Sequence, residues 1–207
     1  MLHLTDHPLI AHELRHLRDR DCGSPEFRTR LRRIASLMVP SVTADLETRA
    51  VSCTTPMEVT SGRVLARPVT LVPVLRAGLA LMDGFLDMIP QASVAHIGLR
   101  RDESTLRPQS YYVNHPPEMA THDVIVLDPM LATGGSASEA IRMIVQAGAA
   151  SVRFVCLVAS PEGIAALESA FPCLPIHAAA LDRCIDDRGF ILPGLGDAGD
   201  RMFGTAG

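Results

Sequence analysis

One stretch of the chain, Val124 to Ser136, combines the residue types that a site for a phosphorylated sugar needs. It begins with four apolar residues, continues through Asp128 and ends in a small-residue loop around Gly134 and Gly135, before a helical pattern. Backbone amides of such a loop, and the N-terminus of the helix, direct partial positive charge at a phosphate group. The carboxylate of Asp128 only accepts hydrogen bonds, which suits a vicinal diol. We therefore predict that this stretch binds a sugar phosphate.

Two further segments place arginine close to the end of a predicted strand. Arg76 lies in the short loop Val74–Leu79, and Arg100 and Arg101 lie in the segment His96–Glu103. All 19 basic residues are arginine, so every fixed cation that meets a phosphate must be a guanidinium group, which can bind an oxyanion at two points. The absence of lysine excludes a Walker A loop, a pyridoxal Schiff base and any catalytic lysine. Ordinary solvated arginines are the alternative interpretation.

The residue order from Asp128 to Ser136, DPMLATGGS, resembles the ribose-5-phosphate loop of type I phosphoribosyltransferases. It is similar to the uracil phosphoribosyltransferase family in particular, because a proline follows a single acid where most relatives carry two adjacent acids. Segments 74–79, 96–103 and 189–205 extend the resemblance, and the last is similar to the family's uracil-binding tail. The resemblance implies transfer of ribosyl phosphate from 5-phosphoribosyl 1-diphosphate (PRPP) to uracil, which gives UMP and diphosphate in pyrimidine salvage.

The resemblance also implies roles for individual residues. The catalytic residues would be Asp128, Arg101 and Asp197. Uracil would be bound by Ile191, Gly196, Asp197 and Ala198. PRPP would be bound by Arg76, Arg101, Asp128, Pro129, Met130, Leu131, Ala132, Thr133, Gly134, Gly135, Ser136 and Asp197. Mg²⁺ would be carried by PRPP without a direct protein ligand, GTP would be an effector, and the chain would form a homodimer or a higher homo-oligomer.

Two positions depart from the family pattern, since Arg100 and Phe190 stand where tyrosine is usual. At Arg100 the change removes any role of the tyrosine ring and leaves a second arginine that could partly substitute for Arg101, and at Phe190 it removes a hydroxyl group. The base itself can be recognised through the backbone, because uracil has an acceptor at O4 and a donor at N3, whereas cytosine has the reverse at both atoms. A pocket built from backbone N–H and C=O groups cannot exchange donor for acceptor, so we expect it to reject cytosine.

Length and composition favour one compact α/β domain over residues 1–207. The resemblance implies that this is a single phosphoribosyltransferase domain, with an N-terminal helical segment over about 1–40 and a uracil-binding tail over about 182–207. The net charge of -4 gives no reason to expect binding to nucleic acid or to a membrane. The polar N-terminal sequence does not fit a signal peptide. Five cysteines without a CxxC pair favour reduced thiols in the cytoplasm.

Two short motif matches have simpler interpretations. The segment His12–His16 fits the zinc motif HExxH, but no third ligand is evident downstream. The segment Gly194–Gly199 fits the dinucleotide motif GxGxxG, which must open a helix inside a βαβ unit. The few residues that follow are too short for that unit, so we reject both motifs.

Apolar periodicity predicts the elements that must position these residues. The N-terminal 40 residues read as helical, with Ser24 and Pro25 as N-cap and first turn. Further along, the pattern predicts strands at 69–75, 93–99, 123–128, 152–159 and 176–181, helices at 78–88, 135–147 and 162–171, and a polar hood or flap at 100–117. This alternation predicts an α/β fold with a doubly wound, mainly parallel sheet, like that of type I phosphoribosyltransferases. Ligands bind such sheets at the carboxyl ends of the strands, so Arg76, Arg101 and Asp128 should face one crevice.

Two rival functions follow from the same resemblance. A phosphoribosyltransferase-like regulator would bind pyrimidine nucleotides and RNA, and should show a basic face, often rich in lysine. The acidic net charge and the complete tail argue against it. Transfer to another base, such as orotate or a purine, is the second rival, and the tail argues against that as well.

Overall fold

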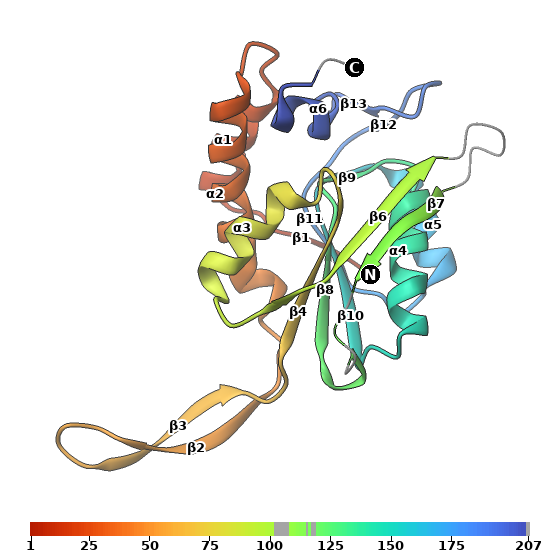
Figure 1. The fold of residues 1–207 in the computed structure, drawn as a ribbon. Helices are drawn as coiled ribbons and strands as arrows, with labels where there is room; N and C mark the ends of the chain where they lie inside the picture. Colours follow the sequence, from red (N-terminus) through yellow and green to blue (C-terminus); the bar gives the residue numbers. More distant parts are fainter. Residues whose placement is uncertain (102–107, 115, 117–118, 206–207) are drawn as a thin grey trace.

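A seven-strand path forms the main sheet of the protein (Figure 1), whose computed structural model describes residues 1–101, 108–114, 116 and 119–205. The strand order is β1-β11-β10-β8-β4-β6-β7. In that order the strands span Leu2–Leu4, Ile176–Leu181, Ser151–Ala159, Asp123–Leu127, Val69–Leu75, His96–Arg101 and Pro108–Asn114. Every neighbouring pair on the path is parallel except β6 and β7. Short strands β5 (Ser93–Val94) and β9 (Met130–Leu131) pair with β4 and β10.

Helices cover both faces of this sheet, as the alternating pattern predicted. Figure 1 shows α1 (Pro8–Arg18), α2 (Ser24–Val42) and α3 (Leu79–Met88) on one face, and α4 (Gly135–Gln146) and α5 (Pro161–Ala170) on the other. Side chains alternate along β8, so that Ile125 and Leu127 belong to the core under α1–α3, and Val124 and Val126 to the core under α4 and α5. The doubly wound, mainly parallel sheet is therefore confirmed.

Helix α2 carries the apolar stripe that its sequence predicts, because Phe27, Leu31, Ile34 and Met38 are all fully buried. The predicted cap is wrong by one residue. Gly23 is the N-cap, with extended backbone and no side-chain hydrogen bond, while Ser24 is already helical. On α4, Ile141 and Ile144 are buried, but Val145 is exposed, because it lies at the edge of the stripe.

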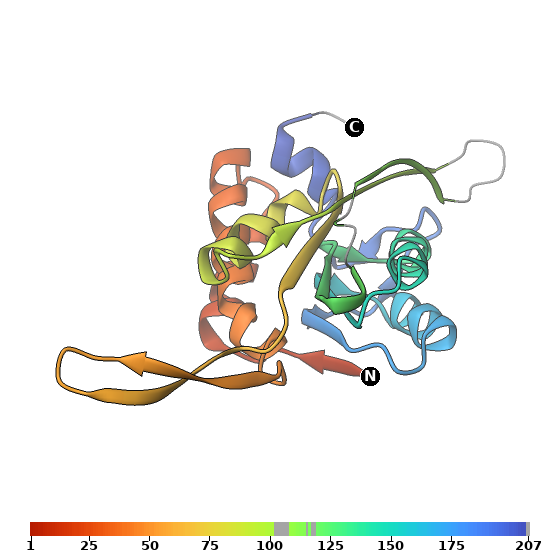
Figure 2. The same cartoon turned by 60° about the horizontal axis from the view of Figure 1, so that its bottom comes forward.

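Three predictions from the sequence need correction. The first residues are not helical, because Leu2–Leu4 forms β1 and pairs in parallel with β11. The strand predicted at 93–99 is divided between β5 and β6. Strands β2 (Thr48–Thr54) and β3 (Val59–Leu65), which the apolar pattern did not indicate, form an antiparallel hairpin. Figures 1 and 2 both show this hairpin extending away from the body of the molecule.

The predicted flap is partly described and is antiparallel where it is seen. Strand β7 pairs with β6, with a shift of register between Gly98 and Leu99. The ring of Tyr111 lies against Gly98, where a Cβ atom would come within 2.6 Å of it. Residues 102–107, which include the predicted tip, lie outside the described residues.

Two polar residues, Arg153 and His177, are buried in the sheet near the end of α2 and contact the exposed residues Asp45 and His3. Arg153 donates from Nη1 to the carbonyl oxygen of Val42 at 2.6 Å and to the carboxylate of Asp45. His177 stacks on His3 with ring centroids 4.9 Å apart, and its Nδ1 atom is buried without a hydrogen-bond partner. Burial is the main reason that the pKa of His177 falls to about 4, and the nearby positive charges of His3 and Arg153 add to the effect.

We predict that His177 makes the protein acid-sensitive. In the unfolded chain His177 binds a proton below its ordinary pKa of 6.5, whereas in the folded protein it binds one only near pH 4. The free energy of unfolding is therefore highest above pH 6.5 and decreases as the pH falls from 6.5 to about 4. The loss reaches up to about 3 kcal/mol. Urea unfolding at pH 7 and pH 4 should show a smaller pH-dependent loss in His177→Leu than in wild type. Equal losses in the two proteins would contradict the assignment.

Candidate active site

The carboxyl ends of the parallel strands bring polar residues to one edge of the sheet. Arg76 follows β4 directly and Asp128 follows β8, as predicted, while Ser160 follows β10 and Asp182 follows β11. Asp128 is held to the neighbouring strand by its own N–H, which donates to the carbonyl oxygen of Val155 at 3.1 Å. Parallel pairing therefore brings Arg76 and Asp128 to the expected edge of the sheet.

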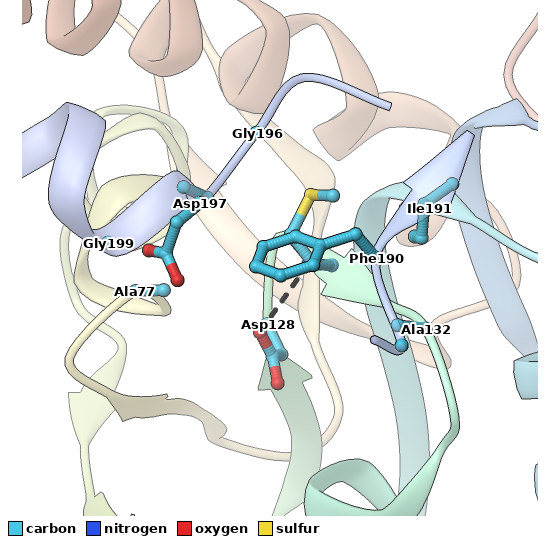
Figure 3. Close-up of a pocket in the computed structure, with 11 residues that line it drawn as sticks. Ala77, Asp128, Ala132, Phe190, Ile191, Gly196, Asp197 and Gly199 are labelled. Carbon is cyan, nitrogen blue, oxygen red and sulfur yellow. Dashed lines mark hydrogen bonds between the residues drawn. The ribbon is translucent and has the colours of Figure 1, made fainter. Parts of the chain in front are cut away.

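A cavity of about 210 Å³ opens at this edge. It is lined by Ala77, Asp128, Met130, Ala132, Gly189, Phe190, Ile191, Gly196, Asp197, Ala198 and Gly199. Figure 3 shows the carboxylates of Asp128 and Asp197 entering it from different elements, with the ring of Phe190 projecting over it. The structure thus brings together the acid that follows β8 and the residues predicted to bind uracil.

Four lining residues were not among the predicted site residues: Ala77, Gly189, Phe190 and Gly199. Each lies within two residues of a predicted residue inside one of the glycine-containing motifs, and this closeness in sequence was the available signal. A Cβ atom on Gly199 would lie 3.9 Å from Cβ of Ala77, and one on Gly189 would lie 3.8 Å from Cγ2 of Thr133. Three separate segments of the chain are therefore in contact around the cavity.

The carboxyl group of Asp128 is half-buried and has one weak hydrogen bond, from the N–H of Met130 at 3.5 Å. Burial raises the pKa of Asp128 to about 7, and the Met130 hydrogen bond opposes the rise only in part. A carboxyl group that changes charge near neutral pH can accept hydrogen bonds from sugar hydroxyls and can offset positive charge that develops beside it.

The loop after Asp128 has the geometry of an anion site. Gly134 caps α4 with φ of +77°, a conformation that glycine adopts without strain, and a Cβ atom there would come within 3.0 Å of Ala166. Thr133 and Ser136 are exposed at the start of α4, with their hydroxyls available as donors. Amides of this loop and of the first turn of α4 can therefore bind a phosphate group.

The other predicted loop residues support the backbone and do not line the cavity. Pro129 and Leu131 are buried, and the carbonyl oxygen of Pro129 accepts from the N–H groups of Leu157 and Val158 at 3.0 Å. The hydroxyl of Ser160 donates to the carbonyl oxygen of Ala132 at 2.6 Å and also caps α5. The loop is thus fixed from below by β10 and α5.

Arg76 lies beside the cavity and is attached to the C-terminal tail. Its Nη2 atom is 3.4 Å from Oδ1 of Asp200, its guanidinium carbon is 5.7 Å from the centre of the Phe203 ring, and the side chain is 57% exposed. The Leu75–Arg76 peptide bond is cis. Arg101 ends β6, and its side chain lies outside the described residues.

The tail consists of the short strands β12 (Cys184–Ile185) and β13 (Ile191–Leu192) and the helix α6 (Ala198–Phe203). Asp197 caps α6, with its carboxylate accepting from the N–H of Asp200 at 2.9 Å. The GxGxxG segment therefore ends in a helix of six residues and opens no βαβ unit. In the HExxH segment, the carboxylate of Glu13 is bound to Arg30 at 2.6 Å and to Arg33 at 3.2 Å, so it serves a structural ion pair.

Comparison with known proteins identifies the family. The family model described as uracil phosphoribosyltransferase matches residues 4–205 of the chain. The chain belongs to the uracil phosphoribosyltransferase family. A uracil phosphoribosyltransferase of Alkaliphilus oremlandii is 50% identical over 203 residues, which cover 98% of this chain and 97% of that protein. A uracil phosphoribosyltransferase of Geobacillus sp. strain WCH70 is 48% identical over 205 residues, which cover 99% of this chain and 98% of that protein.

Solved structures agree with this membership. A protein of Aquifex aeolicus superposes with a TM-score of 0.94 at 33% identity, covering 100% of this chain and 99% of that one. A hypoxanthine phosphoribosyltransferase of Staphylococcus aureus superposes with a TM-score of 0.53 at 14% identity, covering 81% and 85%, and so shares the fold. The fold of this family member is therefore that of type I phosphoribosyltransferases. None of the helices within the described residues is long and apolar enough to cross a membrane.

We predict that Asp128→Asn stabilises the protein at alkaline pH. In the folded protein the pKa of Asp128 is raised from 3.8 to about 7, so between these pH values Asp128 is protonated in the folded protein and ionised in the unfolded chain. The wild-type protein therefore loses stability as the pH rises through this window. The variant does not titrate, and its stability relative to wild type should rise between pH 5 and pH 8 by up to about 3 kcal/mol.

Thermal unfolding at both pH values measures this difference, with Asp83→Asn on the exposed surface of α3 as the matched control. If Asp128→Asn gains the same stability at pH 5 and at pH 8, or if Asp83→Asn shows the same pH-dependent gain, then Asp128 is not the cause of the loss of stability with rising pH.

Proposed function

We propose that this protein transfers ribosyl phosphate from PRPP to N1 of uracil, giving UMP and diphosphate in pyrimidine salvage. One observation carries the proposal. The glycine-containing loop before α4, the half-buried Asp128 and the backbone of the C-terminal tail lie together at one cavity. The names of the similar proteins support the same substrates. We also treat residues 1–207 as one domain, since tail residues Ile191 and Leu195 share a core with Ile10 and Phe27.

In this proposal PRPP occupies the side of the cavity formed by the residues that follow β8. Its 5-phosphate binds the amides of residues 132–136 at the N-terminus of α4. Its ribose hydroxyls donate to Asp128, which must then be ionised. The diphosphate binds Arg76 and Arg101. An ion pair between exposed groups, such as Arg76 with Asp200, contributes only about 0–1 kcal/mol, so Arg76 can leave Asp200 for the diphosphate.

Uracil is placed between the tail and the ribose. Backbone groups of Ile191, Gly196 and Ala198 would hold its polar edge, and Asp197 would lie between base and sugar, in contact with PRPP. These backbone groups cannot exchange donor for acceptor, so cytosine is rejected. Phe190, which lines the cavity, offers the base an apolar ring without a hydroxyl.

The chemistry is a substitution at C1 of the ribose. The bond from C1 to the diphosphate oxygen breaks ahead of attack, the bond from N1 to C1 forms on the opposite face, and uracil loses its N1 proton. Asp128 and Asp197 offset the positive charge of the oxocarbenium-like sugar, while the arginines stabilise the departing diphosphate. We propose that Mg²⁺, which prefers oxygen ligands, comes bound to PRPP without a direct protein ligand. When bound, it would neutralise charge on the leaving group.

We further propose that the protein acts in the cytoplasm as a homodimer or a larger homo-oligomer, with GTP as an effector. All five cysteines are free, which suits a reducing compartment. The β2–β3 hairpin extends from the body of the molecule (Figures 1 and 2). It supports self-association, because isolated two-stranded hairpins are marginally stable in water and this one exposes apolar side chains. Met57 is 91% exposed and Val59 is 68% exposed.

Self-association through the hairpin predicts that Met57→Asp combined with Val59→Asp lowers the molar mass in solution, since buried charge without a partner is costly. Light scattering after size exclusion measures the mass. Leu9→Asp, at an apolar residue of α1 that is 56% exposed, is the matched control and should keep the wild-type mass. A wild-type monomer, or an unchanged mass in the double variant, would contradict this use of the hairpin.

Activity is tested directly by uracil-dependent release of diphosphate from PRPP, with and without Mg²⁺ and GTP. A panel of bases in the same assay tests transfer to cytosine, orotate or a purine. The rival RNA-binding regulator is tested by gel shift at physiological salt. Product formed from uracil alone, without an RNA shift, supports the proposal, whereas a stronger reaction with another base would replace it.

Within this reaction, Asp128→Asn and Arg101→Ala should each lower turnover more than tenfold, because one loses charge beside the sugar and the other loses charge on the leaving group. Steady-state kinetics measures turnover, and circular dichroism checks the fold. Arg100→Ala is the matched control, since Arg100 donates to Gln109 at 3.4 Å on the neighbouring strand. Near-normal turnover in both variants would remove these roles.

A further inference from the structure

The loop that leads to Gly196 is held from outside the cavity by an arginine of α6. Arg201 donates from Nη1 to the carbonyl oxygen of Leu195 at 2.7 Å and to that of Leu17, at the end of α1, at 2.6 Å. Its Nη2 donates to the carbonyl oxygens of Asp19 and Cys22 in the turn between α1 and α2. One side chain thus joins the base loop to a turn 179 residues away in the chain.

The packing around Arg201 fixes the plane of its guanidinium group. The group lies over the ring of the fully buried Phe27, with 4.6 Å from its carbon atom to the ring centre. Cδ of Arg201 is 3.5 Å from the place that a Cβ atom on Gly196 would take. Lysine could not reproduce this arrangement, because its single ammonium group cannot reach several carbonyl oxygens in one plane.

A second arginine binds the preceding peptide group. Arg18 donates to the carbonyl oxygen of Gly194 at 2.8 Å and to both carboxylate oxygens of Asp182, at 2.6 and 2.7 Å. Asp182, whose side chain is 5% exposed, also accepts from the N–H of Gly194 at 2.8 Å. Both polar groups of Gly194 and the carbonyl oxygen of Leu195 are therefore bound before the chain reaches Gly196.

We propose that Arg201, assisted by the Arg18–Asp182 pair, is a positioning residue for recognition of the pyrimidine base. This inference rests on the proposed function. Hydrogen bonding by peptide groups discriminates between bases only while those groups keep their direction, because a rotated peptide presents a donor where an acceptor was. By fixing the peptide groups up to residue 195, Arg201 sets the direction in which Gly196 and Ala198 face the base.

The contacts of Arg201 predict that its loss affects the binding of uracil and not the binding of PRPP. The carbonyl groups that Arg201 binds belong to the base loop and to the end of α1, whereas the phosphate loop is supported by Ser160 and β10. Loss of Arg201 should therefore weaken the binding of uracil and its discrimination from cytosine, and should leave the binding of PRPP nearly unchanged.

The experiment compares Arg201→Lys with wild type and with Arg153→Lys. Arg153 is a matched control, because its guanidinium group also donates to a carbonyl oxygen, that of Val42 at 2.6 Å, in a buried position under α2. In Arg201→Lys we expect the KM for uracil to rise at least tenfold, the KM for PRPP to change less than twofold, and the preference for uracil over cytosine to fall at least fivefold. In Arg153→Lys all three values should stay within twofold, whatever its loss of Tm.

Several outcomes would overturn the proposal. A wild-type KM for uracil in Arg201→Lys would do so, as would equal rises in the KM values of both substrates or equal effects in the control. If Arg201→Lys does not fold, the same measurements of KM and base preference on Arg18→Lys test the proposal in its place. Failure of the wild-type protein to form UMP would refute the proposed function itself, whereas an active wild type with an unaffected Arg201→Lys would refute only the positioning role.

Discussion

Parallel strand pairing is the constraint on which the rest of this molecule depends. Because β4, β8, β10 and β11 run in the same direction, their carboxyl ends meet at one edge, and each end delivers a different polar residue there. Two of these, Arg76 and Asp128, lie at the cavity, and the other two, Ser160 and Asp182, support loops behind it. A fold that separated these strand ends would keep every motif and lose the site.

Asp128 and Arg201 differ in how many hydrogen bonds their charged groups make. Among the described residues, Asp128 accepts one long hydrogen bond, from Met130, and burial raises the pKa of its carboxyl group to about 7. Arg201 has the opposite arrangement, since four carbonyl oxygens surround its charge. The first arrangement leaves a group free to respond to a ligand, and the second holds a loop in one shape.

Much of the fold and of the site could be predicted from the sequence, for identifiable reasons. Mainly apolar runs gave the bounds of β4 and β11 without error, and the residue order around Asp128 predicted the strand, loop and helix from β8 to α4. Strand β1 has three residues, too few for a periodic signal, and the few apolar residues of the exposed β2–β3 hairpin do not alternate with the period of a strand. The contacts of Arg18 and Arg201 join the two ends of the chain, which no local pattern records.

The clamp that Arg18 and Arg201 form has a consequence for biosynthesis. Under the proposed function, residues 76–136 form the sugar-phosphate side of the cavity, whereas residues 189–199 form the base side and are joined through Arg201 to the turn at residues 19–22. Cys22 in this turn is synthesised 179 residues before Arg201, which binds its carbonyl oxygen. On this proposal, a nascent chain completes the sugar-phosphate side of the cavity before it acquires specificity for the base.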